Sequence, residues 1–579
     1  MLYGNSYEGR LTLAEMAATK DLIFSAEGVN DSIAVVRTDS HVELRSNGKV
    51  DASTDDARTQ LLLGHLGAAF HPLPRRVLII GFGSGMTAAA VSGYPDVEKI
   101  DCVEIEAAVI RAAPYLESLN RGVLKDPRLH VIFDDARNFL LTTREKYDLI
   151  ISEPSNPWIA GIATLFTAEY YAAARQRLAP GGIFVQWVQA YSIAPADLRM
   201  ITATYASQFP QVTLWRAGET DLLLLGRTDP SPFEFGHLRS VWDHRAVRDD
   251  FASLDIHEPE GLVAYFLLDD AAVRKLAEGG KLNTDDHTLL EYHAPQSLLA
   301  GDLIGADQDL VARFRTSPLP ANLEARERPE ALLAGATTAL DLNDRANAKN
   351  FLEALDAQPE SAREDVARGR LAWLEGSLPS AELSLEAALK LDPDSLEAMH
   401  WLAIAQQGNG EEPAARSRVA EMLKRNPRFL PALDDEMYFA VARRDFREAL
   451  SAQLTRIAVI GDAPAYEYCR LGGIWIALSH IADAESILLE GLQKDPYSYA
   501  CHLELGELYQ RTGQLPLARE NFEWVIRFFP AAEATVFGSL AEVDLLLGDR
   551  KSAHSVLGKG RRLFPEDAEL QKAAARLGP

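Results

Sequence analysis

The spacing of hydrophobic residues changes twice along this chain of 579 residues, and each change indicates a different kind of structure. Residues 1–70 contain short segments in which apolar and polar side chains alternate, such as SIAVVRTD (32–39) and HVELRSNG (41–48). Asn-Gly and Glu-Gly pairs interrupt these segments, which is typical of β-hairpins. We therefore expect a small β-hairpin domain over 1–70 that ends in a helix within 55–70.

The second pattern, over residues 71–300, consists of apolar runs separated by helical segments. The first five runs are RRVLII (75–80), KIDCVEIE (99–106), RLHVIFDD (128–135), KYDLIISE (146–153) and GGIFVQWV (181–188). Two more runs, at 211–217 and 220–227, are spaced as a hairpin that could close the sheet. Strands that alternate with helices predict an α/β domain with a parallel, doubly wound sheet. Helices and loops are expected over the rest of this domain, followed by a linker at 301–327.

The third pattern, over residues 328–579, is a helical repeat. Alanines recur every 34 or 35 residues: Ala381, Ala415, Ala449, Ala484, Ala518 and Ala553. Prolines keep the same period, with one missing near position 461: Pro359, Pro393, Pro427, Pro496, Pro530 and Pro565. Gly369, Gly472 and Gly506 stand twelve residues before their alanines. Small residues allow helices to cross closely, and proline ends a helix. This period resembles the tetratricopeptide repeat, which pairs two helices per unit, and predicts about seven units. The first unit is atypical because it has Asn347 in place of the alanine.

Composition narrows the function classes. Acidic residues outnumber basic ones by 84 to 58, a net charge of −26, which argues against nucleic acid as the main partner. The three cysteines, Cys102, Cys469 and Cys501, have neither disulfide-framework nor zinc-site spacing, so we expect reduced thiols, no metal and a reducing compartment. The first residues lack the features of a secretory signal, and no run of about 18 apolar residues predicts a membrane span.

A glycine-rich turn, GFGSG (81–85), ends the first apolar run. Glycines let a backbone turn tightly and approach a ligand. A phosphate-binding P-loop would need a following Gly-Lys-Ser/Thr, and a nucleophile elbow would need Ser84 in another frame. A dinucleotide fingerprint would need a small residue where Met86 stands. G-x-G-x-G is instead typical of loops that bind S-adenosylmethionine, although any glycine-rich turn after a strand could give the same motif.

Acidic residues end the following runs on the same predicted sheet edge. Glu104 ends the second run and is placed to accept hydrogen bonds from ribose hydroxyls, while Asp134 and Asp135 end the third and could face an adenine. The alternative is that these acids only cap the helices that follow. Glu153 ends the fourth run and begins EPSNPW (153–158), a proline-bounded loop at the edge where ligands bind in such sheets.

These motifs together resemble the spermidine synthase family, the polyamine aminopropyltransferases, over about residues 30–225. EPSNPW, QWVQAY (186–191) and LNTDDHTLLEY (282–292) are similar to a bacterial branch whose members carry tetratricopeptide repeats or a membrane region. The resemblance implies a Rossmann-like sheet of the S-adenosylmethionine-dependent methyltransferase type. It implies decarboxylated S-adenosylmethionine as the donor, a small amine such as putrescine as the acceptor, and a homo-oligomer.

The resemblance also assigns residues. It implies that Glu153 is the catalytic base that takes a proton from the attacking amine. The residues implied to hold the donor are Gln60, Gly81, Gly83, Ser84, Gly85, Glu104, Asp135 and Ala136. Those implied to hold the acceptor are Asp51, Asn156, Trp158, Gln186 and Tyr191.

The chain departs from the family where the acceptor is concerned. The family's D-x-S-D-P has Glu153 and Asn156 in place of its two aspartates, and Ser84 replaces an aspartate of the glycine loop. Because buried ammonium groups need counter-charges, we expect the acceptor to differ from plain putrescine, unless Asp51 and Asp55 fold over the site.

Three functions remain open. The first is aminopropyl transfer, and the second is methyl transfer from ordinary S-adenosylmethionine, which Ser84 favours because it would not repel the methionine carboxylate. The third is a non-catalytic nucleoside-binding scaffold that recruits a protein through its repeats. We expect a protein or peptide in the repeat groove in each case, and a cytoplasmic location with membrane association as the alternative.

Overall fold

The computed structural model describes residues 18–38, 41–218, 220–231, 233–297, 304–355, 361–530 and 533–577. One compact unit comprises residues 23–35 and 43–391, and a second comprises residues 392–579 with two short N-terminal segments. No helix in the described ranges is both long and apolar enough to cross a lipid bilayer.

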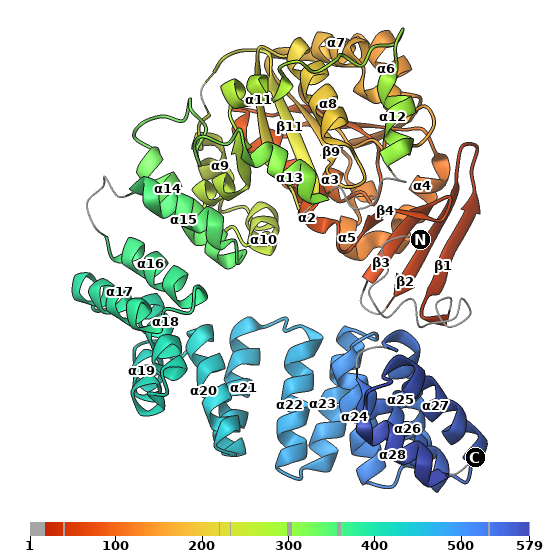
Figure 1. Ribbon diagram of the computed structural model, residues 1–579, viewed down its shortest axis with the longest axis vertical. Coiled ribbons are helices and arrows are strands. Elements are labelled where there is room, and N and C mark those ends of the chain that lie inside the picture. Colours follow the sequence, from red (N-terminus) through yellow and green to blue (C-terminus); the bar gives the residue numbers. More distant parts are fainter. Residues whose placement is uncertain are drawn as a thin grey trace. The chain divides into compact units, whose positions relative to one another are not determined.

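Four strands form the small N-terminal sheet in the order β1-β2-β3-β4 (Figure 1). They are β1 (Asp21–Glu27), β2 (Ser32–Thr38), β3 (His41–Ser46) and β4 (Lys49–Ser53). Asn47 and Gly48, between β3 and β4, both have positive φ, at 50° and 83°. Such a pair is what a two-residue hairpin turn requires, so the hairpin predicted from Asn-Gly is confirmed.

The larger sheet has eight strands in the order β12-β10-β11-β9-β8-β5-β6-β7. They are β5 (Arg76–Ile80), β6 (Lys99–Glu104), β7 (Leu129–Phe133), β8 (Tyr147–Ser152), β9 (Leu178–Gln189), β10 (Gln211–Arg216), β11 (Asp221–Arg227) and β12 (Phe266–Leu268). The first five are parallel, and the last three pair antiparallel. The predicted α/β fold is therefore confirmed, and β12 is an edge strand that the sequence pattern did not indicate.

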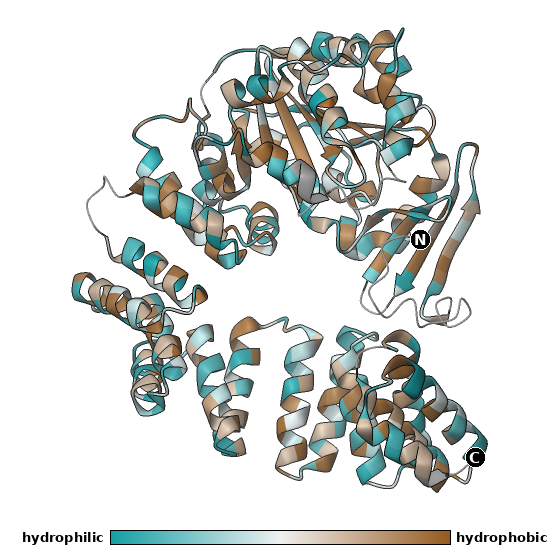
Figure 2. Cartoon of the chain, viewed as in Figure 1, coloured by the Kyte–Doolittle hydropathy of each residue, from teal (hydrophilic) through white to brown (hydrophobic). Residues whose placement is uncertain are grey.

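Helices cover this sheet, whose strands are predominantly hydrophobic (Figure 2). The helices are α2 (Ala57–Phe70), α3 (Met86–Ser92), α4 (Ala107–Ala112), α5 (Glu117–Asn120), α6 (Ala136–Thr142), α7 (Ala168–Arg177), α8 (Pro195–Gln208), α9 (Gly236–Val241), α10 (Arg245–Ser253), α11 (Asp270–Ala277), α12 (Leu289–Ser297) and α13 (Ile304–Ala312), with short 3-10 turns η2 (Ala113–Leu116), η3 (Val123–Lys125), η4 (Ile162–Phe166) and η5 (Pro259–Tyr265). The order of the parallel strands reverses between β5 and β8. Ligands bind at such a switch point, at the carboxyl ends of the strands.

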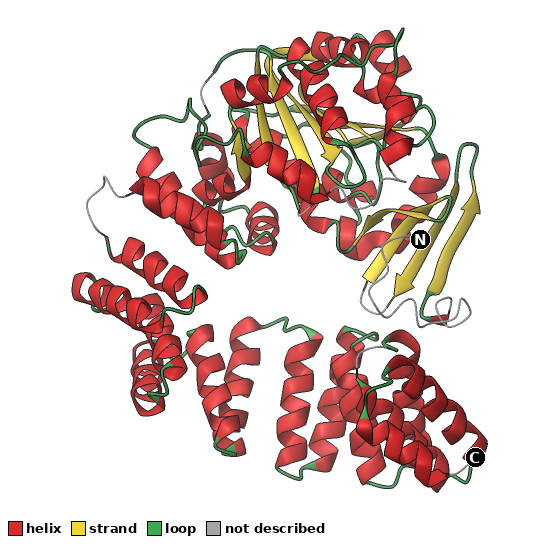
Figure 3. Ribbon diagram, viewed as in Figure 1, coloured by secondary structure: helices red, strands yellow, loops and turns green. Residues whose placement is uncertain are grey.

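The C-terminal region contains only helices in its described residues (Figure 3). In the first unit these are α14 (Arg328–Asp341), α15 (Arg345–Leu355), α16 (Ala362–Leu374) and α17 (Leu378–Leu391). In the second they are α18 (Leu396–Gly408), α19 (Glu412–Arg425), α20 (Leu430–Ala442), α21 (Phe446–Ile460), α22 (Ala465–Ala477), α23 (Ile481–Lys494), α24 (Tyr499–Arg511), α25 (Leu515–Phe528), α26 (Ala534–Leu546), α27 (Arg550–Leu563) and α28 (Ala568–Leu577). Consecutive helices pack in pairs, so the predicted helical repeat is confirmed.

Packing explains the small residues of the repeat. The six periodic alanines are all completely buried. A Cβ atom on Gly369, Gly472 or Gly506 would lie only 2.4–2.6 Å from a side-chain carbon of the paired helix, so a larger residue would push the helices apart. Asn347 differs for a separate reason: its side-chain amide donates to the carbonyl of Ala264 at 2.9 Å and accepts from Arg315 at 2.7 Å. The first repeat is thus bound to the sheet domain by a polar contact that alanine could not make.

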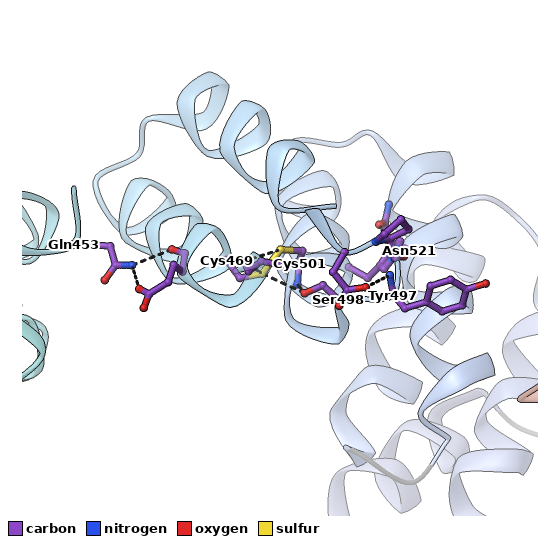
Figure 4. The surroundings of a disulfide bond; sticks show 11 residues. Gln453, Cys469, Tyr497, Ser498, Cys501 and Asn521 are labelled. Atoms are coloured by element: carbon purple, nitrogen blue, oxygen red, sulfur yellow. Dashed lines mark hydrogen bonds between the residues drawn. A yellow bond between two sulfur atoms is a disulfide. The ribbon is translucent and has the colours of Figure 1, made fainter. Parts of the chain in front are cut away.

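The expectation about the cysteines was wrong. Cys469 of α22 and Cys501 of α24 form a disulfide with a Cα–Cα distance of 5.1 Å (Figure 4). The two residues are 32 positions apart, about one repeat period, so the repeat brings equivalent helices side by side and with them the sulfurs. Spacing rules for local motifs cannot detect this arrangement. Cys102 is a buried free thiol.

Candidate active site

A cavity of about 480 Å³ lies at the carboxyl ends of the parallel strands, within the first unit. The N-terminal strands β3 and β4, the glycine turn after β5 and the loop after β8 all contribute to its wall. The candidate residues that line it are Asp51, Gln60, Gly81, Gly83, Glu104, Asp135, Ala136, Glu153, Asn156 and Tyr191. The fold therefore brings together ten of the fourteen side chains or glycines singled out from the sequence.

The glycine turn adopts a backbone that favours glycine at three positions. Gly81, Gly83 and Gly85 have φ values of 89°, 53° and 89°. A Cβ on Gly81 would lie 2.8 Å from the carbonyl oxygen of Glu153, so this glycine also allows the loop after β8 to approach β5. Gly81 and Gly83 line the cavity, whereas Gly85 starts helix α3 behind it, against the ring of Phe82.

Glu104 ends β6 and is nearly buried. Its carboxylate accepts hydrogen bonds from the backbone N–H of Phe82 at 2.9 Å and from that of Glu106 at 2.8 Å. Burial raises the pKa of Glu104 in spite of these donors. The side chain thus ties the glycine turn to β6 and presents a carboxylate to the cavity.

Asp135 follows β7 and caps helix α6, because its side chain accepts from the backbone N–H of Asn138 at 2.9 Å. Ala136, the first residue of α6, lines the cavity with it. The alternative interpretation was that Asp135 only caps a helix. In the structure Asp135 caps α6 and also lines the cavity.

Glu153 follows β8, and its backbone N–H donates to the carbonyl of Ile80. The carboxylate accepts from the hydroxyl of Thr87 at 3.0 Å. Burial raises the pKa of Glu153 to about 8, and the nearby carboxylates of Asp56, Asp221 and Asp51 contribute to the increase. A carboxyl group with such a pKa can exchange a proton near neutral pH, which is the property required of an acid–base catalyst.

Four candidate residues, Ser84, Gly85, Trp158 and Gln186, are not among those that line the cavity. Ser84 is fully buried and bonds the amide of Gln60, and Gly85 was described above. Gln186 is also fully buried and donates to the carbonyl of Trp187. Trp158 packs against the ring of Tyr191, with centroids 5.8 Å apart.

Tyr191 and Asn156 form a polar pair in the wall. The amide of Asn156 donates to the hydroxyl of Tyr191 at 2.8 Å. Burial raises the pKa of Tyr191 well above its usual value, so the phenol stays neutral at physiological pH. Beside them, Ser155 donates to Asp51, which also forms an ion pair with Lys49.

The sequence interpretation missed an acidic group at the start of β11. Asp221 lines the cavity and accepts two hydrogen bonds, from the indole of Trp187 at 2.9 Å and from the hydroxyl of Thr59 at 3.0 Å. Burial raises the pKa of Asp221. Asp56, which accepts from Ser53 at 2.8 Å, also lines the cavity, and its pKa is raised by burial as well. No local motif surrounds Asp56 or Asp221, so no sequence signal identified them.

The cavity wall is strongly acidic. Nine carboxylates line it: Asp31, Asp51, Asp56, Glu104, Glu106, Asp134, Asp135, Glu153 and Asp221. Lys49 is the one basic residue among the described residues of the wall. The fold thus adds two carboxylates to the wall, Asp56 and Asp221, that the family's acceptor motif did not point to, and the expectation that the acceptor differs from plain putrescine stays a prediction. Carboxylates this close to one another favour a cationic ligand.

The central part of the chain is similar to a known protein family. Residues 57–217 match the family described as spermine/spermidine synthase domain. The polyamine aminopropyltransferase of Aeropyrum pernix is 36% identical over 186 residues, which cover 31% of this chain and 59% of that protein. Polyamine aminopropyltransferase 1 of Pseudomonas aeruginosa is 38% identical over 125 residues, which cover 21% of this chain and 43% of that protein. The chain thus spans about half the length of the curated relatives it matches.

Among solved structures, the spermidine synthase of Thermotoga maritima aligns with 44% of this chain and 87% of its own, at 23% identity and a TM-score of 0.35. The family resemblance stated from the motifs is confirmed for the sheet domain by the sequence matches.

Proposed function

We propose that this protein transfers the aminopropyl group of decarboxylated S-adenosylmethionine to an amine. The observation that carries the proposal is the position of Glu153, a carboxyl group with a pKa of about 8, next to a glycine turn in a cavity lined by nine carboxylates and one ammonium. The donor has a sulfonium and an ammonium, and the acceptor is an ammonium in water. All of these cations suit an acidic wall.

The reaction needs one proton transfer and one displacement. Ionised Glu153 takes a proton from the acceptor's ammonium group, which frees the nitrogen lone pair. That lone pair attacks the donor carbon next to sulfur, so a C–N bond forms while the C–S bond breaks. Sulfur leaves as the neutral thioether methylthioadenosine, and the product leaves as a secondary ammonium. Positive charge near Glu153 favours its ionised form, so binding of the two cationic substrates prepares the base.

The same electrostatics favours the decarboxylated donor over ordinary S-adenosylmethionine. The ordinary donor carries a carboxylate, which nine acidic residues would repel. Ser84 does not support methyl transfer, since it is buried, bonds Gln60 and does not line the cavity. Methyl transfer is therefore the weaker alternative.

Incubation of the purified protein with each donor and a panel of amines tests the proposal. We expect methylthioadenosine from the decarboxylated donor with at least one amine. Formation of S-adenosylhomocysteine from the ordinary donor would establish methyl transfer instead. Binding of adenosyl compounds without either product would favour the non-catalytic scaffold.

We also propose that helices α18–α28 bind a protein or peptide. Support comes from large side chains that these helices leave exposed, including Tyr438 at 57% and Tyr466 at 52% of their surface. A pull-down with residues 392–577 as bait, compared with a Tyr438→Ser, Tyr466→Ser double variant, tests this role. Homo-oligomer formation and location in the cell remain predictions, and the Cys469–Cys501 disulfide gives a reason to test oxidising compartments as well.

A further inference from the structure

The segment of residues 282–291, LNTDDHTLLE, has no role in the reaction proposed above, and none of its residues lines the cavity. It follows α11, runs into the first turn of α12 and packs on the loop that follows β8. That loop carries Glu153 and then forms part of the cavity wall, through Ala160, Gly161, Ile162, Thr164 and Leu165. The contacts between segment and loop are specific hydrogen bonds.

Asn283 is the centre of these contacts and is fully buried. Its side-chain amide donates to the carbonyl of Ala163 at 3.1 Å and to that of Phe166 at 3.2 Å, while its oxygen accepts from the N–H of Leu290. Its backbone carbonyl accepts from the N–H of Ala168. One side chain therefore fixes both ends of the 3-10 turn η4, whose residues line the cavity.

Glu291 holds the start of the same turn. Its Oε1 accepts from the N–H of Gly161 at 3.0 Å, and the φ of Gly161 is 84°. The first N–H groups of a helical turn have no partner within the turn, so an external carboxylate stabilises them. Glu291 belongs to α12 and is separated from Gly161 by 130 positions.

Asp285 connects the loop to the donor side of the cavity through Arg137. The guanidinium of Arg137 donates to Asp285 at 2.8 Å in a bidentate pair, and to the carbonyl of Thr164 at 2.9 Å. Arg137 lies in α6, directly after Asp135 and Ala136, which line the cavity. The arginine thus joins the wall formed by Asp135 and Ala136 to the wall formed by residues 160–165.

We propose that Asn283, Asp285 and Glu291 are positioning residues that hold these two walls at the separation the adenosyl donor requires. The inference rests on the proposed function for the identity of the donor. Ala136, Ile162 and Leu165 supply apolar side chains to these walls, and Ile105, after β6, adds another to the cavity, as a slot for a flat base needs. Loosening either wall should weaken donor binding and leave acceptor recognition at Asp221 unchanged.

The test compares four variants by calorimetric titration with methylthioadenosine, the adenosyl product of the proposed reaction. Glu291→Ala removes the acceptor for the Gly161 N–H, and Glu291→Gln keeps one. Asp285→Asn weakens the pair with Arg137, and Asp286→Asn is its matched control on the exposed neighbouring residue. Asn283 is left intact, because a change at this buried centre would threaten folding.

We expect the dissociation constant to rise about 10-fold in Glu291→Ala and Asp285→Asn, the loss typical of one hydrogen bond to a charged group. Glu291→Gln and Asp286→Asn should stay within about 2-fold of wild type, and the acceptor KM should not change in any of the four. Equal dissociation constants in Asp285→Asn and Asp286→Asn, together with an unaffected Glu291→Ala, would overturn the inference.

The binding measurement separates this inference from the proposed function. If the wild type binds methylthioadenosine and turns over no amine, the proposed function fails and the four dissociation constants still decide the role of the segment. A wild type that does not bind the probe overturns both. If Glu291→Ala unfolds, hydrogen exchange of residues 160–166 in Asp285→Asn provides the second measurement, and protection equal to that of Asp286→Asn would overturn the inference.

Discussion

Two groups of residues meet in the cavity, and they differ in how the chain supplies them. The strand-end group, Gly81, Gly83, Glu104 and Asp135, comes from positions just after consecutive parallel strands. The Asp221 group, Thr59, Trp187, Tyr191 and Asp221, comes from a helix, an antiparallel strand pair and a loop. The first group follows from strand register alone. The second exists only because β9 and β11 pair and α2 packs against them.

The two groups also differ electrostatically. Glu104 accepts two backbone hydrogen bonds in the strand-end group, so its carboxylate is partly satisfied without a ligand. Asp221 accepts from two neutral side chains, and no basic residue in the described part of the chain forms an ion pair with it or with Glu153. We infer that the strand-end group recognises hydroxyl and amino donors of a nucleoside, whereas the Asp221 group recognises charge. The experiments below test that division.

The largest effect is expected from Glu153→Gln. Glutamine keeps the shape and can still accept from Thr87, but it cannot take a proton, so kcat should fall about 100-fold or more. The affinity for methylthioadenosine should stay unchanged, and Glu98→Gln on the exposed side of the domain serves as the control. Normal turnover by the glutamine variant would exclude Glu153 as the base.

The pH dependence should report the same group. In the free protein the pKa of Glu153 is about 8, so kcat/KM should rise about tenfold per pH unit below 8 and level off above it. The folded state binds the proton more tightly than the unfolded state, whose pKa is near 4.5, so this group's contribution to stability falls as pH rises from 4.5 to 8. Urea denaturation at several pH values should show that slope in wild type and less of it in Glu153→Gln.

Glu104→Gln addresses the strand-end group. The uncharged amide of glutamine should weaken the binding of adenosyl compounds by about 1–3 kcal/mol, because a ribose hydroxyl of the ligand then lacks a charged hydrogen-bond acceptor. Calorimetry with methylthioadenosine measures the change, and the acceptor KM provides the internal comparison. An affinity equal to that of wild type would remove Glu104 from the nucleoside site.

Asp221→Asn is the reciprocal experiment. Asparagine retains an acceptor for Trp187 or Thr59 but removes the charge, so the acceptor KM should rise about tenfold while methylthioadenosine binds as before. Steady-state kinetics with a diamine and a monoamine of equal length sharpens the result, since only the diamine can offer a second ammonium. If the KM rises equally for the diamine and the monoamine, Asp221 does not recognise a distal charge.

The smallest effect on the cavity should come from the disulfide, which lies in the other compact unit. Thiol titration of the denatured protein should find one free thiol, Cys102, before reduction and three after it. Cys501→Ser should lower the stability of the repeats by about 2–4 kcal/mol and leave kcat unchanged. Three thiols in the unreduced protein would show that the bond does not form.

The sequence by itself determined the features that depend on local geometry. Gly81 could be identified because a tight turn after a strand needs positive φ, and Glu104, Asp135 and Glu153 because parallel strands end at one edge. The repeat could be recognised in the sequence for a similar reason, because small residues such as Ala381 and Gly472 recur wherever two helices cross closely.

Only the tertiary structure decided the features that depend on distant contacts. Asp56 and Asp221 resemble ordinary surface acids in the sequence, and burial beside Glu153 depends on how α2, β9 and β11 pack. Ser84 has the right position in its motif, but it is fully buried, bonds the side chain of Gln60 and does not line the cavity. Cys469 and Cys501 become partners because the repeat period brings α22 beside α24, a contact that neither residue's neighbours in sequence encode.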